Sequence, residues 1–61
     1  MKASRLDDME QFIIEHRSVE LETLCEHFGI SVSTARRDLD SLVDRGRVAK
    51  VYGGVKALDI P

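Results

Sequence analysis

The sequence has 61 residues, a formal net charge of -2 at pH 7 and 43% apolar residues. A chain of this length forms one domain at most, buries only about 60% of the surface that its unfolded form exposes, and has no room for a deep catalytic pocket. The longest apolar run is far below the roughly 20 residues that cross a bilayer, and a single cysteine cannot form an internal disulfide. We therefore expect a small cytoplasmic domain that is not an enzyme, binds no metal or cofactor and does not contact a membrane.

The two halves of the chain differ in charge. Residues 1–28 carry three basic and seven acidic side chains, whereas residues 29–61 carry six basic and four acidic ones. An excess of positive charge in one half is typical of a protein that meets a polyanion on one side.

A first helix is predicted from about Arg5 to His16. Ser4 is followed three residues later by Asp7, an arrangement that can cap a helix start. Apolar residues then recur at helical spacing, at Leu6, Met9, Phe12 and Ile13, with His16 at the end of the same stripe. Val19 is the one apolar residue in the break that follows, and it predicts either a very short strand or an extended linker pinned to the core.

Two further helices are predicted on either side of a short turn. The first of them follows the i, i+3, i+4, i+7 rule at Leu21, Leu24, Cys25 and Phe28, and Gly29 is suited to its C-terminus. Ser31 is the expected N-cap of the next helix, which runs to Gly46. Its apolar stripe consists of Val32, Ala35, Leu39, Leu42 and Val43. This spacing is that of a helix-turn-helix pair, and the helix from about Arg5 to His16 is expected to close the core beneath it.

The segment "RVAKVYGGVKAL" after Gly46 predicts a β-hairpin. β-Branched residues flank Gly53-Gly54, and such a pair readily supplies the positive φ angles of a two-residue turn. Val48 and Val51 fall on opposite faces, so the register stays open. Residues 59–61 suggest a frayed end or the start of a linker. The expected fold class is mainly α (α+β), with three helices and a C-terminal hairpin.

The third helix presents a polar face opposite its apolar stripe. Its members are Ser33, Thr34, Arg37, Ser41 and Asp44. Arg36 flanks the stripe, where its aliphatic stem could cover the edge of the core. Free backbone N–H groups and the positive end of the helix dipole lie beside the arginines and suit contact with phosphate or base edges. The alternative is a solvated surface with the intrahelical pairs Arg37–Ser41 and Arg36–Asp40.

A family resemblance extends over residues 5 to 56. Its motifs are Arg5, Met9 and Ile13 at four-residue steps, then Ser31-x-x-Thr34-Ala35-Arg36-Arg37-Asp38-Leu39, then Gly46 and Tyr52-Gly53-Gly54-Val55. This pattern resembles the N-terminal winged helix-turn-helix of the DeoR family of bacterial transcriptional regulators. The resemblance implies a single winged helix-turn-helix domain over residues 1–61, with a core from about 5 to 58, that binds double-stranded DNA sequence-specifically. Cys25 stands where the family usually has a small residue such as Ala, and acidic residues are more plentiful than expected.

The resemblance also implies where DNA would bind. The expected contacts are Ser31, Ser33, Thr34, Arg36 and Arg37 on the third helix, Lys50, Tyr52 and Lys56 on the wing, and Arg5. Ser31 is expected to serve first as an N-cap, whereas Ser33 and Thr34 have no evident structural role. The three wing residues are equally interpretable as ordinary hairpin surface. A further alternative for Tyr52 is that it packs against the core with its hydroxyl outward. Arg5 is interpretable either as a phosphate contact or as helix surface.

Asp38 and Cys25 are interpreted as structural residues. Asp38 flanks the apolar stripe and is expected to bond to a neighbouring helix or to a local basic group. Cys25 is expected to be a small buried core residue rather than a redox sensor.

DeoR-type regulators typically join this domain to a C-terminal domain that binds a sugar phosphate or related metabolite and carries the oligomer contacts. The resemblance therefore implies that this chain lacks the effector domain, that the full-length protein is a homo-oligomer, and that it represses a sugar or related pathway. The alternative function is a winged-helix module for protein–protein interaction, which the acidic composition favours. An enzyme is the least favoured class, because no nucleophile–base pair, phosphate loop or metal cluster is present in the sequence.

Overall fold

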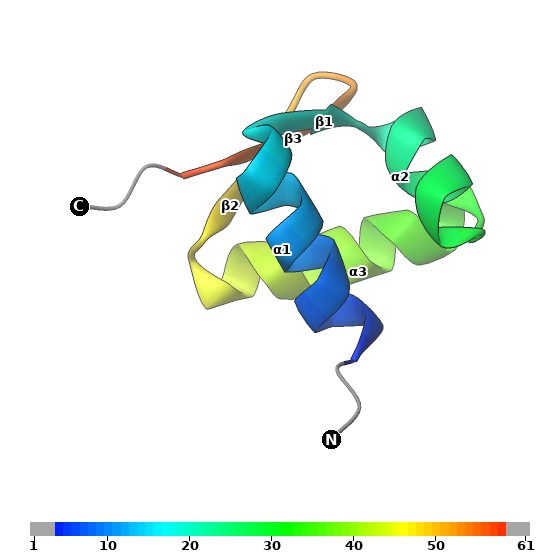
Figure 1. Ribbon diagram of the computed structural model, residues 1–61, viewed down its shortest axis with the longest axis horizontal. Coiled ribbons are helices and arrows are strands. Elements are labelled where there is room, and N and C mark those ends of the chain that lie inside the picture. The colour runs from blue at the N-terminus through cyan, green and yellow to red at the C-terminus, as the bar shows by residue number, and fades with distance from the viewer. Residues whose placement is uncertain (1–3, 59–61) are drawn as a thin grey trace.

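The computed structural model describes residues 4–58, and the expected linker at residues 59–61 lies outside them. In chain order the elements are α1 (Arg5–His16), β1 (Ser18–Glu20), α2 (Leu21–Phe28), α3 (Val32–Arg45), β2 (Val48–Val51) and β3 (Gly54–Ala57). Helix α1 packs across α3, α2 lies beside the N-terminal end of α3, and the strands form one small sheet (Figure 1). This is the expected winged helix-turn-helix. No helix within the described residues is both long and apolar enough to span a membrane.

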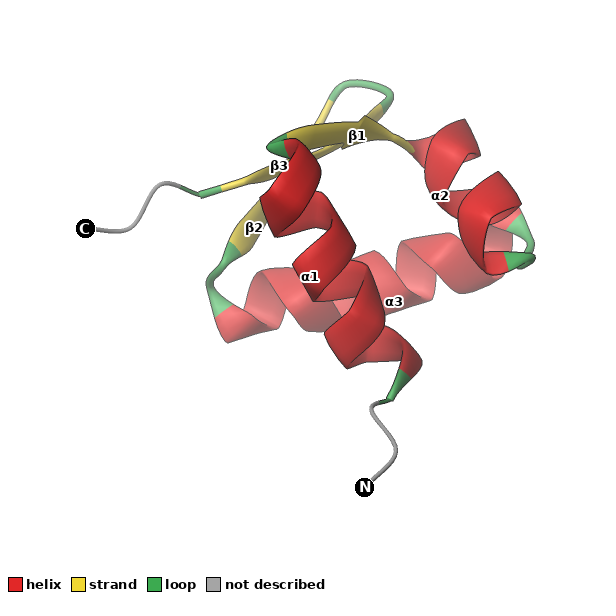
Figure 2. Cartoon of the chain, viewed as in Figure 1, coloured by secondary structure: helices red, strands yellow, loops and turns green. Residues whose placement is uncertain are grey.

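The helix ends lie where their capping residues predict them. The Ser4 side chain accepts a hydrogen bond from the Asp7 backbone N–H at 3.2 Å and begins α1. Gly29 ends α2 with φ of 64°, and Gly46 ends α3 with φ of 84°. Both glycines occupy the left-handed region that side chains with a Cβ rarely adopt. The predicted bounds of the three helices are therefore confirmed (Figure 2).

The hairpin belongs to a three-stranded antiparallel sheet in the order β1-β3-β2. Val19 of β1 pairs with Val55 of β3, which in turn lies opposite Lys50 of β2. The segment around Val19 is thus a strand rather than an extended linker, and it occupies the other edge of β3. Val48 is buried and Val51 is 43% exposed, as their predicted opposite faces require.

The hairpin turn differs from the prediction by one residue. Val51 pairs with Gly54, so the two turn residues are Tyr52 and Gly53, and only Gly53 has a positive φ, 77°. Gly54 instead begins β3, where a Cβ would collide with the backbone oxygen of Val19. The second glycine therefore serves the close approach of β1 rather than the turn.

The core lies between the three helices and one face of the sheet. Its buried apolar side chains are Met9, Ile13, Val19, Leu24, Ala35, Leu39, Leu42, Val48 and Val55. Two expectations about burial were wrong: Val32 and Val43 of the predicted α3 stripe are 44% and 37% exposed, and Cys25 is only partly buried. His16 is exposed, and its Nδ1 lies 2.8 Å from the carbonyl oxygen of Phe12.

Candidate DNA interface

The outer face of α3 carries two arginines in its N-terminal half. Ala35, Leu39 and Leu42 are buried in the core, so the helix period turns Arg36 and Arg37 outward, and both are exposed. The intrahelical pair of Arg36 with Asp40 does not form, and neither guanidinium is near enough to a described acidic side chain to make a salt bridge. Both charges are therefore available to an external anion.

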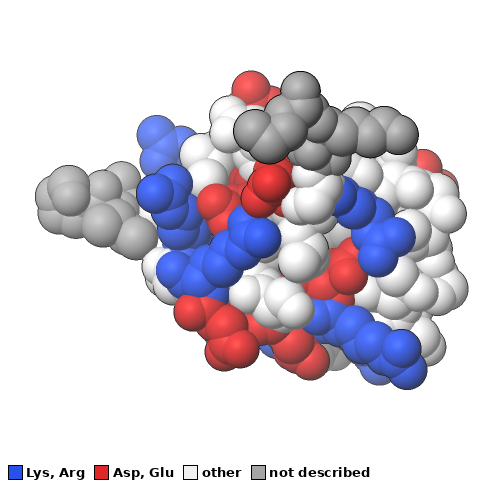
Figure 3. All heavy atoms as spheres, turned by 90° about the horizontal axis from the view of Figure 1, so that it is seen from below, with Lys and Arg blue, Asp and Glu red and all other residues white. Residues whose placement is uncertain are grey.

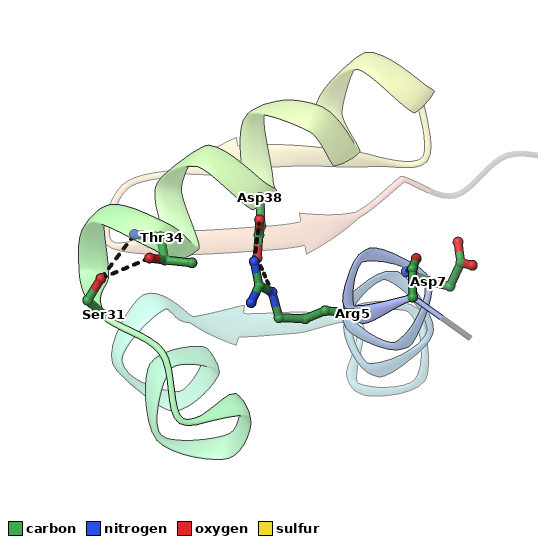
Figure 4. Close-up of polar contacts among 6 residues, drawn as sticks. Arg5, Asp7, Ser31, Thr34 and Asp38 are labelled. Atoms are coloured by element: carbon green, nitrogen blue, oxygen red, sulfur yellow. Dashed lines mark hydrogen bonds and ion pairs between the residues drawn. The ribbon is translucent and has the colours of Figure 1, made fainter. Parts of the chain in front are cut away.

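Ser31 and Thr34 together cap the start of α3. The Ser31 hydroxyl oxygen accepts a hydrogen bond from the Thr34 backbone N–H at 3.2 Å and donates one to the Thr34 hydroxyl at 3.1 Å (Figure 4). Thr34 thus has a structural role that the sequence did not reveal, and it is only partly exposed. Ser33, next to it, is exposed, and the described structure gives its side chain no hydrogen-bond partner. Of the three hydroxyls, that of Ser33 is the most available for a ligand.

Arg5 reaches from α1 to Asp38 on α3. Its Nε donates to Oδ2 of Asp38 at 2.7 Å, and its Nη2 donates to Oδ1 at 3.2 Å (Figure 4). The Asp38 side chain is 12% exposed and that of Arg5 is 48% exposed. The expected bond from Asp38 to a neighbouring helix is therefore present, and two of the guanidinium donors of Arg5 are used within the fold.

The sheet places the two wing lysines on different faces. Lys50 lies opposite buried Val55 and is two residues from buried Val48, so it shares their face of the sheet, the side toward α3, where it forms an ion pair with Asp40. Lys56 is the next residue along β3 from Val55, and its side chain points to the other face. Only Lys50 is thus brought beside α3.

Tyr52 occupies the tip of the wing and is fully exposed. The alternative in which its ring packs against the core is wrong. Between the wing and α3 lies a hollow of about 200 Å³, lined by Leu21, Arg36, Leu39, Lys50, Val51, Gly53 and Gly54. Arg36 and Lys50 therefore line one surface recess, from α3 and from β2, together with core residue Leu39.

At the C-terminal end of α3, unlike its N-terminal half, the arginines lie near acidic side chains of α1. Arg45 donates to Asp7 at 2.9 Å and to Glu10 at 3.2 Å, and Arg47 lies 4.0 Å from Glu10. The hydrogen bond from Arg45, followed by that from Ser4, holds the pKa of Asp7 below its usual value. Residues 35 or more apart in the chain make these pairs, so local spacing could not reveal them. Basic and acidic side chains interleave over the face seen in Figure 3.

Comparison with known proteins identifies the domain. The family model for the DeoR-like helix-turn-helix domain matches residues 5–60. The HTH-type transcriptional regulator IolR of Bacillus subtilis is 42% identical over 97% of this chain and 24% of its own length. The L-fucose operon activator of Escherichia coli is 34% identical over 92% of this chain and 23% of its own. The lactose phosphotransferase system repressor of Staphylococcus epidermidis is 32% identical over 92% and 22%.

The chain spans about a quarter of the length of these curated relatives. No solved structure gives a significant match. The matched region contains the capped α3 with its exposed arginines and the wing, and the relatives are named as regulators of transcription. The chain therefore belongs to the DeoR family of transcriptional regulators and contains that family's DNA-binding helix-turn-helix domain.

Proposed function

We propose that this domain binds double-stranded DNA sequence-specifically by inserting the N-terminal half of α3 into the major groove. The observation that carries the proposal is the pair Arg36 and Arg37, both exposed and free of salt bridges to the described residues, on a helix whose opposite side is fixed in the core. Arginine is the commonest reader of guanine, because its planar fork matches the N7 and O6 acceptors.

The electrostatics of α3 favour entry by its N-terminal end. The free N–H groups of the first turn attract phosphate oxygens, and Ser33 is exposed there. Exposed Asp40 and Asp44 lie in the C-terminal half, which this orientation keeps away from the groove floor. We assign Arg37 and Ser33 to the bases and Arg36 to a base or to the phosphate beside the wing.

The wing contributes contacts beside the helix. Lys50 is on the face of the sheet toward α3 and Tyr52 is at the tip, which supports contacts of both with the flanking backbone or minor groove. Lys56 would contact the same duplex only if the DNA curves around the edge of the wing, because it faces away from α3. Arg5, Ser31 and Thr34 are secondary candidates, since each has a bonding partner within the fold.

A titration followed by NMR tests the proposal directly. Duplexes that bind the 61-residue chain are first selected from a random pool, and the strongest is added to isotope-labelled protein at low salt. We expect the largest amide shifts at residues 31–37 and 50–53, with affinity that falls steeply as salt rises because counterions are released. Failure to select any duplex, or shifts confined to α1 and α2, would refute it and would favour a protein-interaction module.

A matched pair of variants tests the assignment of Arg37. Arg37→Ala removes an exposed arginine from the middle of the proposed interface, and Arg47→Ala removes one beyond the other end of α3. We expect Arg37→Ala to weaken binding to the selected duplex by about 1–3 kcal/mol and to relax sequence preference. Arg47→Ala should change affinity far less. Equal losses would show that total charge, not the geometry of α3, determines binding.

We also propose that the domain works within a longer homo-oligomeric regulator of carbohydrate-related genes whose effector is a sugar phosphate or related metabolite. Support comes from the names of two relatives, which refer to L-fucose and to lactose, one as an activator and one as a repressor. Adding individual sugar phosphates to the full-length protein on its selected duplex tests this. At least one of them should change the affinity, and a complete absence of response would contradict the effector class.

A further inference from the structure

An ion pair joins the wing to the outer side of α3. Lys50 of β2 contacts the carboxylate of Asp40 through its ammonium group. Asp40 lies one helical turn beyond Arg36 and Arg37 and is exposed like them. The acid therefore neutralises the one wing lysine that the sheet turns toward α3.

The same ammonium group cannot serve Asp40 and a DNA phosphate equally well. Both partners remain largely in solvent, with 49% of the Lys50 side chain and 67% of the Asp40 side chain exposed, so the pair is weak and exchangeable. A DNA phosphate that pairs with Lys50 leaves the Asp40 carboxylate unpaired beside a polyanion. Lys50 and Asp40 together also bring no net charge to the duplex, and release of counterions depends on net charge.

We propose that Asp40 is an internal competitor for Lys50 that lowers both the DNA affinity of this domain and the dependence of that affinity on salt. The inference rests on the proposed DNA-binding function and assigns to Asp40 a role in setting its strength. Arg36, which lines the same recess as Lys50, makes no such pair with a described residue and keeps its full charge for DNA. The competitor thus acts on the wing contact while leaving the arginines of α3 unaffected.

Asp44 provides a matched control. It lies one turn further along the exposed side of α3, carries the same charge, and makes no salt bridge to a described residue. Asp40→Asn and Asp44→Asn therefore remove identical charge from one helix face, and only the first frees Lys50. Thermal melts of each variant establish that the fold is retained at the temperature of the binding assay.

The test measures affinity for the selected duplex over a series of salt concentrations, by fluorescence anisotropy. We expect Asp40→Asn to bind about two- to five-fold more tightly at low salt, the range that an exposed ion pair permits. The slope of log affinity against log salt should steepen by about 0.9, one additional phosphate neutralised. Asp44→Asn should change both quantities less. In a Lys50→Met background, Asp40→Asn should lose most of its effect.

The outcomes separate the inference from the function on which it depends. If the unmodified chain binds no duplex, the proposed function fails and the competitor role fails with it. If the chain binds but Asp40→Asn leaves affinity and slope unchanged, only the competitor role is refuted. An equal gain in the Lys50→Met background refutes it as well, since the carboxylate then acts on DNA directly. Weaker binding by Asp40→Asn would also refute it and would make Asp40 a base contact.

Discussion

The bond between Arg5 and Asp38 offers a test of how α1 is fixed to α3. Arg5→Met keeps most of the aliphatic stem and removes both donors, which leaves the carboxylate of Asp38, 12% exposed, without its partner. An orphaned buried acceptor costs about 1–3 kcal/mol, and loss of a partner for a fully buried charge costs more. Arg5 is half exposed and water can reach the site, so we expect a loss of about 1–3 kcal/mol.

Urea denaturation followed by circular dichroism measures this loss. A domain of this size has a stability of about 3–9 kcal/mol and unfolds with a slope near 1 kcal/mol per molar urea, so the midpoint should fall by about 1–3 M. Asp38→Asn should cost less, because the charge that it leaves unpaired is that of Arg5, whose side chain is 48% exposed and can be hydrated. The double variant should be more stable than the sum of the single losses implies, by about 0.5–3 kcal/mol. Additive losses would show that the two side chains do not stabilise the fold through each other.

Three other perturbations have expected outcomes. Leu42→Ala opens a cavity at a fully buried position and should cost about 2–5 kcal/mol in the same urea assay; a loss under 1 kcal/mol would mean that the core collapses around the site. Ser31→Ala removes the cap of α3 and should cost about 1 kcal/mol, with faster amide exchange confined to the first turn; faster exchange throughout the helix would contradict a local role. Arg45→Gln should raise the pKa of Asp7 toward 3.8 in an NMR titration, because the main hydrogen bond that lowers it is lost. Because the pKa of Asp7 is lowered by folding, the carboxylate stabilises the native protein above about pH 4, and this contribution disappears as pH falls through its native pKa. An unchanged titration of Asp7 in the variant would contradict the pairing.

Helix limits were predictable from the sequence because capping is a local property. Ser4, Ser31, Gly29 and Gly46 each act through bonds or backbone angles within a few residues, and all four lie where the pattern placed them. The apolar stripe of α3 was less reliable at its margins. Val32 and Val43 lie at its edge, where burial depends on whether another element covers them, and the described residues leave them 44% and 37% exposed.

Contacts between distant segments were beyond the reach of sequence spacing. Asp38 could be assigned to a bond with a neighbouring helix, but Arg5 as its partner depends on how α1 crosses α3. The Lys50–Asp40 pair likewise depends on the face of β2, and the register had stayed open because the alternation of Val48 and Val51 was ambiguous. The one-residue shift of the turn follows from β1, since its close approach demands Gly54 within the strand.

The position of β3 between β1 and β2 has a consequence for the entropy that the wing loses on binding. The wing is anchored at its tip as well, because the backbone N–H of Leu21 donates to the carbonyl of Gly53 at 3.0 Å. A loop that must become ordered on a ligand loses conformational entropy at that moment and weakens the complex. A strand that is hydrogen-bonded on both edges is already ordered when the domain folds, so it loses little further conformational entropy on binding. The geometry between Tyr52 and α3 is therefore preorganised, and encounter with a duplex becomes a docking of nearly rigid surfaces.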